Sequence, residues 1–577
     1  MDSCNLSHFN KERGHLVIDT LYNLGVHHFC LAPGSRSTPL AIAIAEHSKL
    51  EATVHFDERG LGFYALGLAK ATNSPVALLV TTGTAVANLF PAIMEAHLSR
   101  IPLILLSADR PPELRDCGSN QTADHVNFFG SLTRWDVDFA FSDPLTSYSY
   151  VASTLAYAVS RATNSPAGPV QVNCMIREPF ISLEKPSLQT IPACVYEPVF
   201  SMPSDSSFTL WAKLLSSTKK GVLILGSDAL EKEDLSLFLL FAEKLKWPIF
   251  SDIISGGRSI GNHPYHIEHF ELILKSFPDL EVEAVLQIGN RLVSKTLQQW
   301  IGRQIDPLYL LVTNHPFRQD PLHKVSRKME CRTSDFCQSL LSKLSKDRDS
   351  WAPFWKRQAE LVKETIAEHF STQPSLSEPA LFQFLAPFTA THPFYLSSSM
   401  PIRDADLLFF TQKGSSHFFC NRGASGIDGN IATAAGLAKG LKKPLIAILG
   451  DLATLHDLNS FALAAKSQNP ILFIVINNQG GSIFSFLPVA AKKDIFEEFI
   501  AVSHNYSFES IASMFSLQYD QINSLEDLDT IWNKAMQSQV SHLIECKTIR
   551  QNNVLHHQEL IEKTQKSLSS FLKPLEV

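Results

Sequence analysis

The stretch LIAILGD at positions 445–451, followed by ILFIVINN at 471–478, decides the fold class of this chain. Each stretch is a short apolar run that ends in polar residues, which is typical of a buried parallel strand. The residues between the two runs are numerous enough for a helical crossover. Because ligands bind at the carboxyl ends of the strands in an open α/β sheet, we expect Asp451 and Asn478 to face one ligand site.

The residues at these two strand ends have the chemistry of a divalent-cation site. The Asp451 carboxylate and the Asn478 side-chain carbonyl are hard oxygen ligands that suit Mg²⁺, which usually also takes phosphate oxygens and water. Gly480 and Gly481 follow at once, and glycine lets the backbone approach a diphosphate closely. The motif predicts a metal-assisted diphosphate site. The alternative is that Gly-Asp and Asn-Asn only form turns.

Outward from this motif, the chain divides into three stretches that each alternate short apolar runs with helix-periodic segments. The alternation predicts an α/β protein of three consecutive doubly wound parallel-sheet domains, at residues 1–185, 204–350 and 375–577. A Pro-rich passage at 185–203 is interpreted as a linker. One continuous helix is expected at 84–98. The predicted strands are 28–32, 76–81, 103–107, 170–173, 221–225, 248–250, 284–288, 308–312, 394–397, 445–449, 471–476 and 542–546.

Composition and charge argue against several classes of protein. With 577 residues, a formal net charge of -7 and a pI of about 6.3, the chain offers no basic stripe for nucleic acid or an anionic membrane. No apolar run reaches the roughly 18 residues that span a bilayer, and the polar start has no signal sequence. The nine scattered cysteines favour a reduced, cytoplasmic protein. The histidines at 263, 266 and 269 lack the spacing of a known metal motif and are expected to be packed or solvated.

A Gly-Asp pair followed, after a helix, by Asn-Asn at a strand end resembles the diphosphate and metal motif of thiamine-diphosphate enzymes. Such enzymes also need a carboxylate hydrogen-bonded to the aminopyrimidine ring of the cofactor. Glu58, at the end of a short predicted strand in the first domain, is expected to fill this role. Alone it would be read as a solvated loop glutamate. Its combination with Asp451 and Asn478 favours the catalytic interpretation.

A more specific resemblance rests on motif blocks spread along the chain. In order they are APGSRSTPL (32–40), HFDERGLG (55–62), TGTAVAN (82–88), ADRPPEL (108–114), CGSNQ (117–121), NRGASGIDG (421–429), GDL (450–452) and NNQGGSIF (477–484). Together they resemble the family of 2-succinyl-5-enolpyruvyl-6-hydroxy-3-cyclohexene-1-carboxylate synthases, the thiamine-diphosphate-dependent enzymes of menaquinone biosynthesis.

The resemblance implies a reaction, its cofactors and a set of site residues. It implies that 2-oxoglutarate loses CO2 and that the succinyl carbanion equivalent adds to isochorismate, with thiamine diphosphate and Mg²⁺, or Mn²⁺, as cofactors. Glu58 is then catalytic, and Asp451, Asn478 and Gly480 bind the metal. The cofactor is expected to contact Glu58, Ile427, Asp451, Leu452, Asn478, Gly480, Gly481, Ile483 and Phe484. The two dianionic substrates call for arginine and are expected to contact Ser35, Arg36, Arg110, Asn120, Gln121, Lys295, Ser399, Arg403 and Arg422.

The resemblance also implies an oligomer. In such enzymes the cofactor lies between the first domain of one subunit and the third domain of another, so a homodimer is the minimum and a homotetramer is favoured. Two departures concern single positions. Thr296 follows Lys295 where some family members have a Lys-Arg pair, which leaves Lys295 to act alone. Phe63 and Tyr64 stand where relatives often have a histidine.

Two rival functions remain open at the level of sequence. One is another thiamine-dependent 2-oxo acid decarboxylase or carboligase, such as an acetolactate-synthase-like enzyme, which the arginine cluster and the block at 32–40 disfavour. The other is a noncatalytic paralogue that binds the cofactor as a regulator, which the joint presence of Glu58, Asp451 and Asn478 disfavours.

Overall fold

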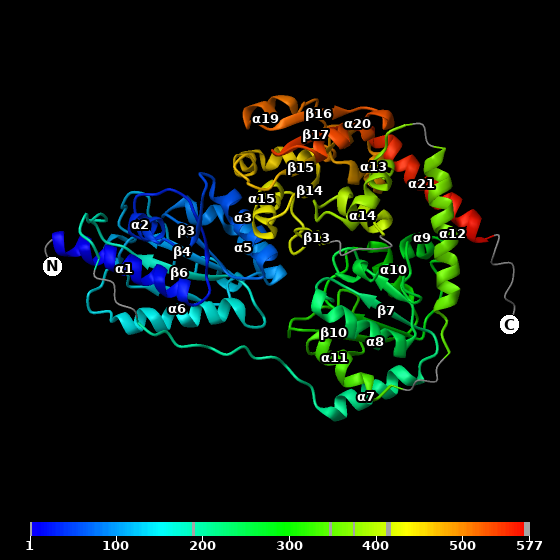
Figure 1. Ribbon diagram of the computed structural model, residues 1–577, viewed down its shortest axis with the longest axis horizontal. Helices are drawn as coiled ribbons and strands as arrows, with labels where there is room; N and C mark the ends of the chain where they lie inside the picture. The colour runs from blue at the N-terminus through cyan, green and yellow to red at the C-terminus, as the bar shows by residue number, and fades with distance from the viewer. Residues whose placement is uncertain (1–2, 187–190, 345–348, 373–374, 411–416, 570–577) are drawn as a thin grey trace.

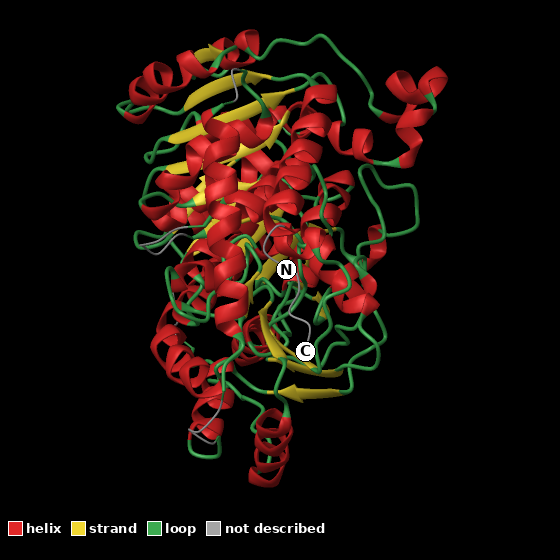
Figure 2. Ribbon diagram, turned by 90° about the vertical axis from the view of Figure 1, so that its right-hand side faces the viewer, coloured by secondary structure: helices red, strands yellow, loops and turns green. Residues whose placement is uncertain are grey.

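The computed structural model of the chain describes residues 3–186, 191–344, 349–372, 375–410 and 417–569. It contains three parallel β-sheets flanked by helices, in three α/β units that follow one another along the chain (Figures 1 and 2). The predicted fold class is confirmed. The residue limits given above for the three domains stay a prediction.

The first sheet has six strands in the order β2-β1-β3-β4-β6-β5. Its centre, β3 (Val76–Val80) and β4 (Leu103–Asp109), is buried along its whole length, as expected of apolar strands in a parallel sheet. The other elements are β1 (His28–Leu31), β2 (Glu51–Val54), β5 (Asp136–Phe139), β6 (Val170–Met175), α1 (Ser3–Asn23), α2 (Thr38–Glu46), α3 (Glu58–Thr72), α4 (Thr84–Asn88), α5 (Phe90–Ser99) and α6 (Tyr148–Thr163).

The helix expected at 84–98 is interrupted. It forms two helices, α4 and α5, that meet at Leu89, and Pro91 lies in the first turn of α5. Proline is tolerated there because the first N–H groups of a helix have no intrahelical partner. Inside one continuous helix its ring would clash with the carbonyl of Ala87. The expectation of a single helix was therefore wrong.

The second sheet has five strands in the order β11-β10-β9-β7-β8. His266 and His269 of this unit are packed, as expected. Their Nδ1 atoms face the carbonyl oxygens of Gly261 and Leu407. Burial lowers the pKa of His266 to about 3 and that of His269 to about 4. The elements are β7 (Gly221–Leu225), β8 (Ile249–Ser251), β9 (Ala284–Ile288), β10 (Leu308–Thr313), β11 (Arg327–Glu330), α7 (Asp205–Ser217), α8 (Leu235–Leu245), α9 (Phe270–Ser276), α10 (Lys295–Arg303), α11 (Thr333–Leu341) and α12 (Ala352–Ser371).

The third sheet has six strands in the order β13-β12-β14-β15-β17-β16. Its two central strands, β14 (Leu445–Gly450) and β15 (Ile471–Asn477), are those predicted from the opening motif. The other elements are β12 (Phe394–Leu396), β13 (Phe418–Phe419), β16 (Gln518–Ile522), β17 (His542–Lys547), α13 (Glu378–Leu385), α14 (Met400–Leu408), α15 (Asn430–Leu441), α16 (Asp451–His456), α17 (Phe461–Ala464), α18 (Lys493–Ile495), α19 (Glu509–Met514), α20 (Leu525–Met536) and α21 (Arg550–Ser569).

The first and third sheets have the same topology. Each reads 2-1-3-4-6-5 when its strands are numbered from its own first strand. The registers also correspond, since Val76 pairs with Leu103 at the start of β3 and β4, and Leu445 pairs with Ile471 at the start of β14 and β15. The first and third domains therefore have related folds.

The first and third domains pack through α3 and α15, which lie side by side (Figure 1). A Cβ added to Gly67 would lie 2.1 Å from the Thr433 carbonyl oxygen, and one added to Gly436 would lie 2.0 Å from the Tyr64 carbonyl oxygen. Each helix thus presses one glycine against the backbone of the other. Only glycine fits at these two positions.

This contact predicts a stability effect. Gly436→Ala is expected to cost about 1–3 kcal/mol, because the new methyl group has no room against a backbone carbonyl. Each kcal/mol should lower the thermal midpoint by about 2–4 °C in a domain of this size. Gly302→Ala is the matched control in α10, where the nearest atom, on Leu322, is 3.7 Å from an added Cβ. Equal midpoints for the two variants in a calorimetric scan would contradict the prediction.

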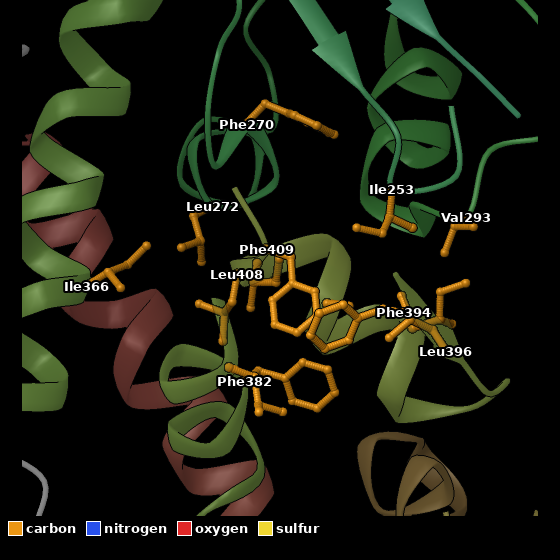
Figure 3. Packing of buried hydrophobic residues seen from close by; sticks show 14 of the residues in the cluster. Ile253, Phe270, Leu272, Val293, Ile366, Phe382, Phe394, Leu396, Leu408 and Phe409 are labelled. Atoms are coloured by element: carbon orange, nitrogen blue, oxygen red, sulfur yellow. The ribbon is translucent and has the colours of Figure 1, made fainter. Parts of the chain in front are cut away.

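Two hydrophobic cores cross domain boundaries. One combines residues of the first and third domains, including Leu66 and Leu437. The other joins the middle and third domains, where Phe270 and Ile253 share a cluster with Phe394 (Figure 3). The third domain is therefore fixed against both others.

Two findings concern the predictions about membrane helices and cysteines. No helix of the described residues is both long enough and apolar enough to cross a membrane. Eight of the nine cysteines have side chains that the structure describes, and these eight are free thiols. Cys30, Cys174 and Cys546 are buried in strands, as expected.

Candidate active site

The carboxyl ends of β14 and β15 bring together the two parts of the opening motif. Asp451 follows β14 directly and is 2% exposed, and Asn478 follows β15 and is 7% exposed. The backbone N–H of Gly480 donates to Asp451 Oδ2 over 2.9 Å. The predicted metal ligands Asp451, Asn478 and Gly480 thus form one cluster.

The donor atoms of this cluster fit a divalent cation. Asn478 Oδ1 is buried and has no hydrogen-bond partner in the part of the chain that the structure describes, although the Nδ2 atom of the same side chain donates to Glu378 Oε1 over 2.8 Å. A buried carbonyl oxygen without a donor is costly unless another group uses its lone pairs. The Asp451 carboxylate, Asn478 Oδ1 and a backbone carbonyl would supply the hard oxygen ligands that Mg²⁺ takes together with phosphate oxygens.

The glycines around the cluster differ in what an added side chain would meet. No heavy atom lies within 4 Å of a Cβ added to Gly450, so the backbone there is open to a ligand. Gly480 has a φ of +142°, and its added Cβ would lie 2.7 Å from the Ala501 carbonyl oxygen. A Cβ on Gly481 would meet the Phe484 ring at 2.7 Å. At Gly480 and Gly481 a side chain would therefore meet other atoms of the chain, and the approach of a diphosphate to this backbone stays a prediction.

Buried charged groups surround the cluster, and the sequence did not indicate any of them. His504 Nε2 lies 3.3 Å from Asp451 Oδ2, and His557 Nε2 lies 2.9 Å from Asp404 Oδ1. Burial first, and then the nearby charge of Asp404, raises the pKa of Glu378 to about 8. The raised pKa means that burial and the neighbouring carboxylate disfavour a further negative charge here, so a bound cation would be favourable.

Glu58 was predicted at the end of a short strand, but β2 ends at Val54 and Glu58 begins a helix. It is the first residue of α3, and the preceding Asp57 caps that helix by accepting from the N–H groups of Arg59 and Gly60. The Glu58 carboxylate is half-buried and accepts a hydrogen bond of 3.4 Å from Asn88, which sequence analysis missed as a partner.

Glu58 and the cation cluster lie toward opposite ends of α16. Arg59 donates to the carbonyl oxygen of His456, the last residue of that helix, whereas Asp451 is its first residue. No hydrogen bond or ion pair of the described residues joins Glu58 to Asp451, Asn478 or Gly480.

In the first domain, two predicted substrate residues contact Thr82, and the charge of a third, Arg36, interacts with that of Arg110. Arg110 donates to the Thr82 hydroxyl, and Gln121 Nε2 donates to the Thr82 carbonyl oxygen over 3.2 Å. Arg36 donates to the Ile176 carbonyl oxygen and to Glu178, and burial, followed by the charge of Arg110, lowers the pKa of Arg36. Ser35 and Asn120 are exposed beside this group.

This group occupies the first-domain counterpart of the cation cluster. Thr82 lies six residues after Val76, the start of β3, and Asp451 lies six residues after Leu445, the start of β14. In the neighbouring strands, Arg110 lies seven residues after Leu103, and Asn478 lies seven residues after Ile471. The same position in two related sheets therefore carries a cationic side chain in one domain and candidate ligands for a cation in the other.

In the third domain, Arg403 and Arg422 form a second cationic group. Ser399 precedes α14, has a φ of +78° and accepts from Arg403 through its backbone carbonyl. Burial, followed by the charge of Arg422, lowers the pKa of Arg403. Lys295, the first residue of α10 in the middle domain, is exposed, and the structure gives it no contact with either arginine.

The first domain supports the loop that carries Arg422. Glu95 is 2% exposed and accepts from the N–H groups of Gly423 and Ala424 over 2.9 and 2.6 Å. Lys70 donates to the Cys420 carbonyl oxygen over 2.6 Å. Sequence reasoning missed both supports, because Glu95 and Lys70 lie on helices whose patterns show only packing.

The apolar residues predicted to pack against a cofactor are partly open. Ile427 is 40% exposed and Phe484 is 37% exposed, while Leu452 and Ile483 are half-buried. Exposed apolar side chains beside a polar cluster are typical of a ligand site or an interface.

Comparison with known families agrees with this arrangement. Residues 11–128 match the family described as thiamine pyrophosphate enzyme, N-terminal TPP binding domain. Residues 203–392 match the middle domain of thiamine pyrophosphate enzymes, and residues 405–546 match their C-terminal TPP binding domain. The three matches follow the order of the three sheets.

Individual relatives narrow the family. The 2-succinyl-5-enolpyruvyl-6-hydroxy-3-cyclohexene-1-carboxylate synthase of Rubrobacter xylanophilus is 37% identical over 96% of this chain and 98% of its own. The synthase of the same name from Salinibacter ruber is 36% identical over 94% of this chain and 95% of its own. The crystal structure of benzoylformate decarboxylase from Polynucleobacter necessarius shares the fold, with a TM-score of 0.68 and 16% identity over 93% of this chain and 98% of its own. This chain therefore belongs to the thiamine pyrophosphate enzymes and, among them, to the 2-succinyl-5-enolpyruvyl-6-hydroxy-3-cyclohexene-1-carboxylate synthase family.

Proposed function

We propose that the protein decarboxylates 2-oxoglutarate and adds the resulting succinyl unit to isochorismate, with thiamine diphosphate and Mg²⁺ as cofactors. The observation that carries the proposal is the buried cluster of Asp451, Asn478 and Gly480, whose unpartnered Asn478 Oδ1 fits a cation ligand. Mn²⁺ could replace Mg²⁺ at the same oxygen ligands. The free, mostly buried cysteines agree with a cytoplasmic enzyme of menaquinone biosynthesis.

The residues of the chain have separate tasks in this reaction. Asp451, Asn478 and the Gly480 carbonyl would hold Mg²⁺ and, through it, the diphosphate, while Ile427, Leu452, Ile483 and Phe484 would pack against the apolar part of the cofactor. When bound, thiamine diphosphate supplies a carbon nucleophile and an electron sink for decarboxylation. Glu58 would accept a hydrogen bond from the aminopyrimidine ring and hold it in the orientation needed for proton transfer.

The arginines suit substrates that carry two carboxylates each. A planar guanidinium binds a carboxylate through two hydrogen bonds, which fixes the orientation of the substrate as well as its charge. Arg36 and Arg110 would serve with Ser35, Asn120 and Gln121 from the first domain, and Arg403 and Arg422 with Ser399 from the third, with Lys295 at the margin of the site. Desolvation already lowers the pKa of Arg36 and of Arg403, so a bound anion would be favourable at both.

A second copy of the chain would complete the site. The segment after the cation cluster exposes apolar side chains, among them Phe499 at 68% and Tyr506 at 63%, and Phe56 beside Glu58 is 62% exposed. Apolar side chains exposed at this level on both halves of a site support an interface between copies. We propose a homodimer as the minimum and a homotetramer as the assembled form.

One substitution tests the role of the arginines. Arg422→Lys is expected to raise the KM of one dianionic substrate by about 10- to 100-fold, because a lost charged hydrogen bond costs about 1.5–3 kcal/mol and lysine has no bidentate fork. Steady-state kinetics with each substrate varied in turn would measure it. Arg332→Lys is the control, since Arg332 pairs with Asp335 on the surface of the middle domain. Unchanged KM values for both substrates in Arg422→Lys would exclude Arg422 from the substrate site.

The assay that tests the function as a whole follows one product, CO2, and one substrate, isochorismate. The purified protein is incubated with Mg²⁺, thiamine diphosphate and 2-oxoglutarate, with and without isochorismate, while CO2 release and loss of isochorismate absorbance are recorded. Turnover that depends on isochorismate is the expected result. Equal CO2 release without isochorismate would favour a general 2-oxo acid decarboxylase, and cofactor binding without any turnover would favour a regulatory paralogue.

A further inference from the structure

Two consecutive asparagines at the end of β15 each contact a buried carboxylate. Asn477 Nδ2 donates to Glu545 Oε1 over 2.7 Å, and Asn478 Nδ2 donates to Glu378 Oε1 over 2.8 Å. Glu545 lies on β17, next to β15 in the sheet, whereas Glu378 is the first residue of α13, 100 residues away in sequence from Asn478. The two contacts have the same chemistry but different surroundings.

The two side chains differ in what their carbonyl oxygens do. Asn477 Oδ1 accepts a hydrogen bond from the N–H group of Gln479 over 3.2 Å. Asn478 Oδ1 is buried without a partner and lies in the cluster that contains Asp451. The first asparagine therefore stabilises the turn, and the second keeps an oxygen available.

Glu378 determines which end of the Asn478 amide faces the cluster. Its Oε1 atom also lies 3.5 Å from the hydroxyl groups of Ser482 and Thr548, so three donors from two segments converge on one oxygen, while Oε2 has no hydrogen-bond partner among the described residues. Because Oε1 is the acceptor in these contacts, it faces the NH2 group of the amide, and a proton on Glu378 would be carried by Oε2. The carbonyl end of Asn478 must then point away from Glu378.

Glu378 is itself held in place. It is 1% exposed, and Ser377 caps the helix that it begins by accepting from the N–H group of Ala380. Asn553 on the C-terminal helix α21 donates to the Ser482 hydroxyl over 3.4 Å, which adds a further connection to the group. A fixed acceptor of this kind limits the Asn478 side chain to one orientation.

We infer that Glu378 is a positioning residue for the cation: by accepting from Asn478 Nδ2 it directs Asn478 Oδ1 toward the divalent metal of the proposed function, on which this inference rests. Partners in the outer shell of a metal site orient the direct ligands, and their loss typically lowers metal affinity by about 10- to 100-fold. Glu378→Ala would leave the amide free to rotate its NH2 group toward the cation.

The test measures metal binding directly, with Mn²⁺ as the probe. Electron paramagnetic resonance reports the concentration of free Mn²⁺, and the sample is the whole chain with thiamine diphosphate present. Glu378→Ala is expected to raise the Kd of Mn²⁺ by about 10- to 100-fold. Asn478→Asp is expected to weaken binding as well, because it sets two carboxyl groups against each other. The double variant Asn478→Asp/Glu378→Gln restores an amide–carboxylate pair in reverse, and its Kd should return to within about tenfold of the wild-type value.

Glu545→Gln is the matched control. It alters the neighbouring contact with Asn477, so it should lower the thermal midpoint while leaving the Kd of Mn²⁺ unchanged within about twofold. An unchanged Kd in Glu378→Ala, or a double variant that binds Mn²⁺ no better than Asn478→Asp, would overturn the inference. Failure of the proposed function is distinguishable, because a wild-type protein that binds Mn²⁺ but does not consume isochorismate leaves the positioning role intact.

Discussion

Glu58→Gln is expected to lower kcat by about 10²- to 10⁴-fold, the range attributed to a positioned acid or base. The amide keeps the size of the side chain and its contact with Asn88 but removes the charge that would hold the aminopyrimidine ring. Binding of Mg²⁺ and thiamine diphosphate should be weakened far less, since Glu58 makes no contact with the cation cluster in the described residues. Release of CO2 under saturating substrates measures the loss.

The control for this variant is the adjacent carboxylate. Asp57→Asn retains a capping oxygen for the N–H groups of Arg59 and Gly60, so α3 should begin at the same residue. Its turnover should stay close to that of the wild type. If Glu58→Gln turned over as fast as Asp57→Asn, Glu58 would have no catalytic role.

Asp451→Ala is expected to weaken binding of Mg²⁺ by about 100-fold or more. Loss of an outer-shell partner alone typically lowers metal affinity by about 10- to 100-fold, and Asp451 is proposed as a direct ligand. Thiamine diphosphate affinity should fall with it, since the metal is proposed to hold the diphosphate. Removing the metal from the wild-type protein with EDTA should have the same consequence. Tryptophan fluorescence titrations with thiamine diphosphate at several Mg²⁺ concentrations would measure both effects.

Asp494→Ala serves as the control for charge alone. Asp494 is an exposed carboxylate of the same domain. Its removal should leave the Mg²⁺ titration unchanged. Loss of the Asp451 acceptor also leaves the Gly480 N–H unpaired, which costs about 1–3 kcal/mol, so circular dichroism should first establish that Asp451→Ala is folded. A folded variant with wild-type Mg²⁺ affinity would remove Asp451 from the metal site.

The two inactive variants together test whether two chains share one site. In a mixed dimer of Glu58→Gln and Asp451→Ala chains, a site built between chains would combine both altered residues in one copy and neither in the other. Refolding the variants together should then restore up to about a quarter of the wild-type activity, given random assembly of a twofold dimer. A site contained in one chain would give no recovery.

Local sequence patterns were sufficient for the fold class and for the metal motif. The apolar runs at 445–449 and 471–476 predicted neighbouring buried strands, and β14 and β15 pair in parallel as expected. Asp451 and Asn478 lie at adjacent strand ends because strand direction and order follow from short-range hydrophobic patterning. Helix boundaries were less predictable, as the break at Leu89 shows, because one proline changes the local geometry without changing the apolar period.

The supports of the site could not be predicted in the same way. Glu378 contacts Asn478, and Glu95 contacts the loop of Arg422, across 100 or more residues of sequence. Each of these carboxylates stands alone in a helix where nothing in the neighbouring sequence indicates a partner. Only packing of the helices against distant segments brings the donors to them, and burial then makes each hydrogen bond obligatory.

The sequence by itself thus determined the three α/β units and the positions of Asp451 and Asn478 at strand ends, since these depend on periodicity and on spacing along the chain. The candidate role of Glu58 came from the resemblance to thiamine-diphosphate enzymes. The tertiary structure alone decided that the first and third sheets share one topology, that Arg110 occupies the counterpart of Asn478, and that Asn478 Nδ2 faces Glu378. The physical reason is that strand register and amide orientation are set by contacts between distant segments, which local patterns do not record.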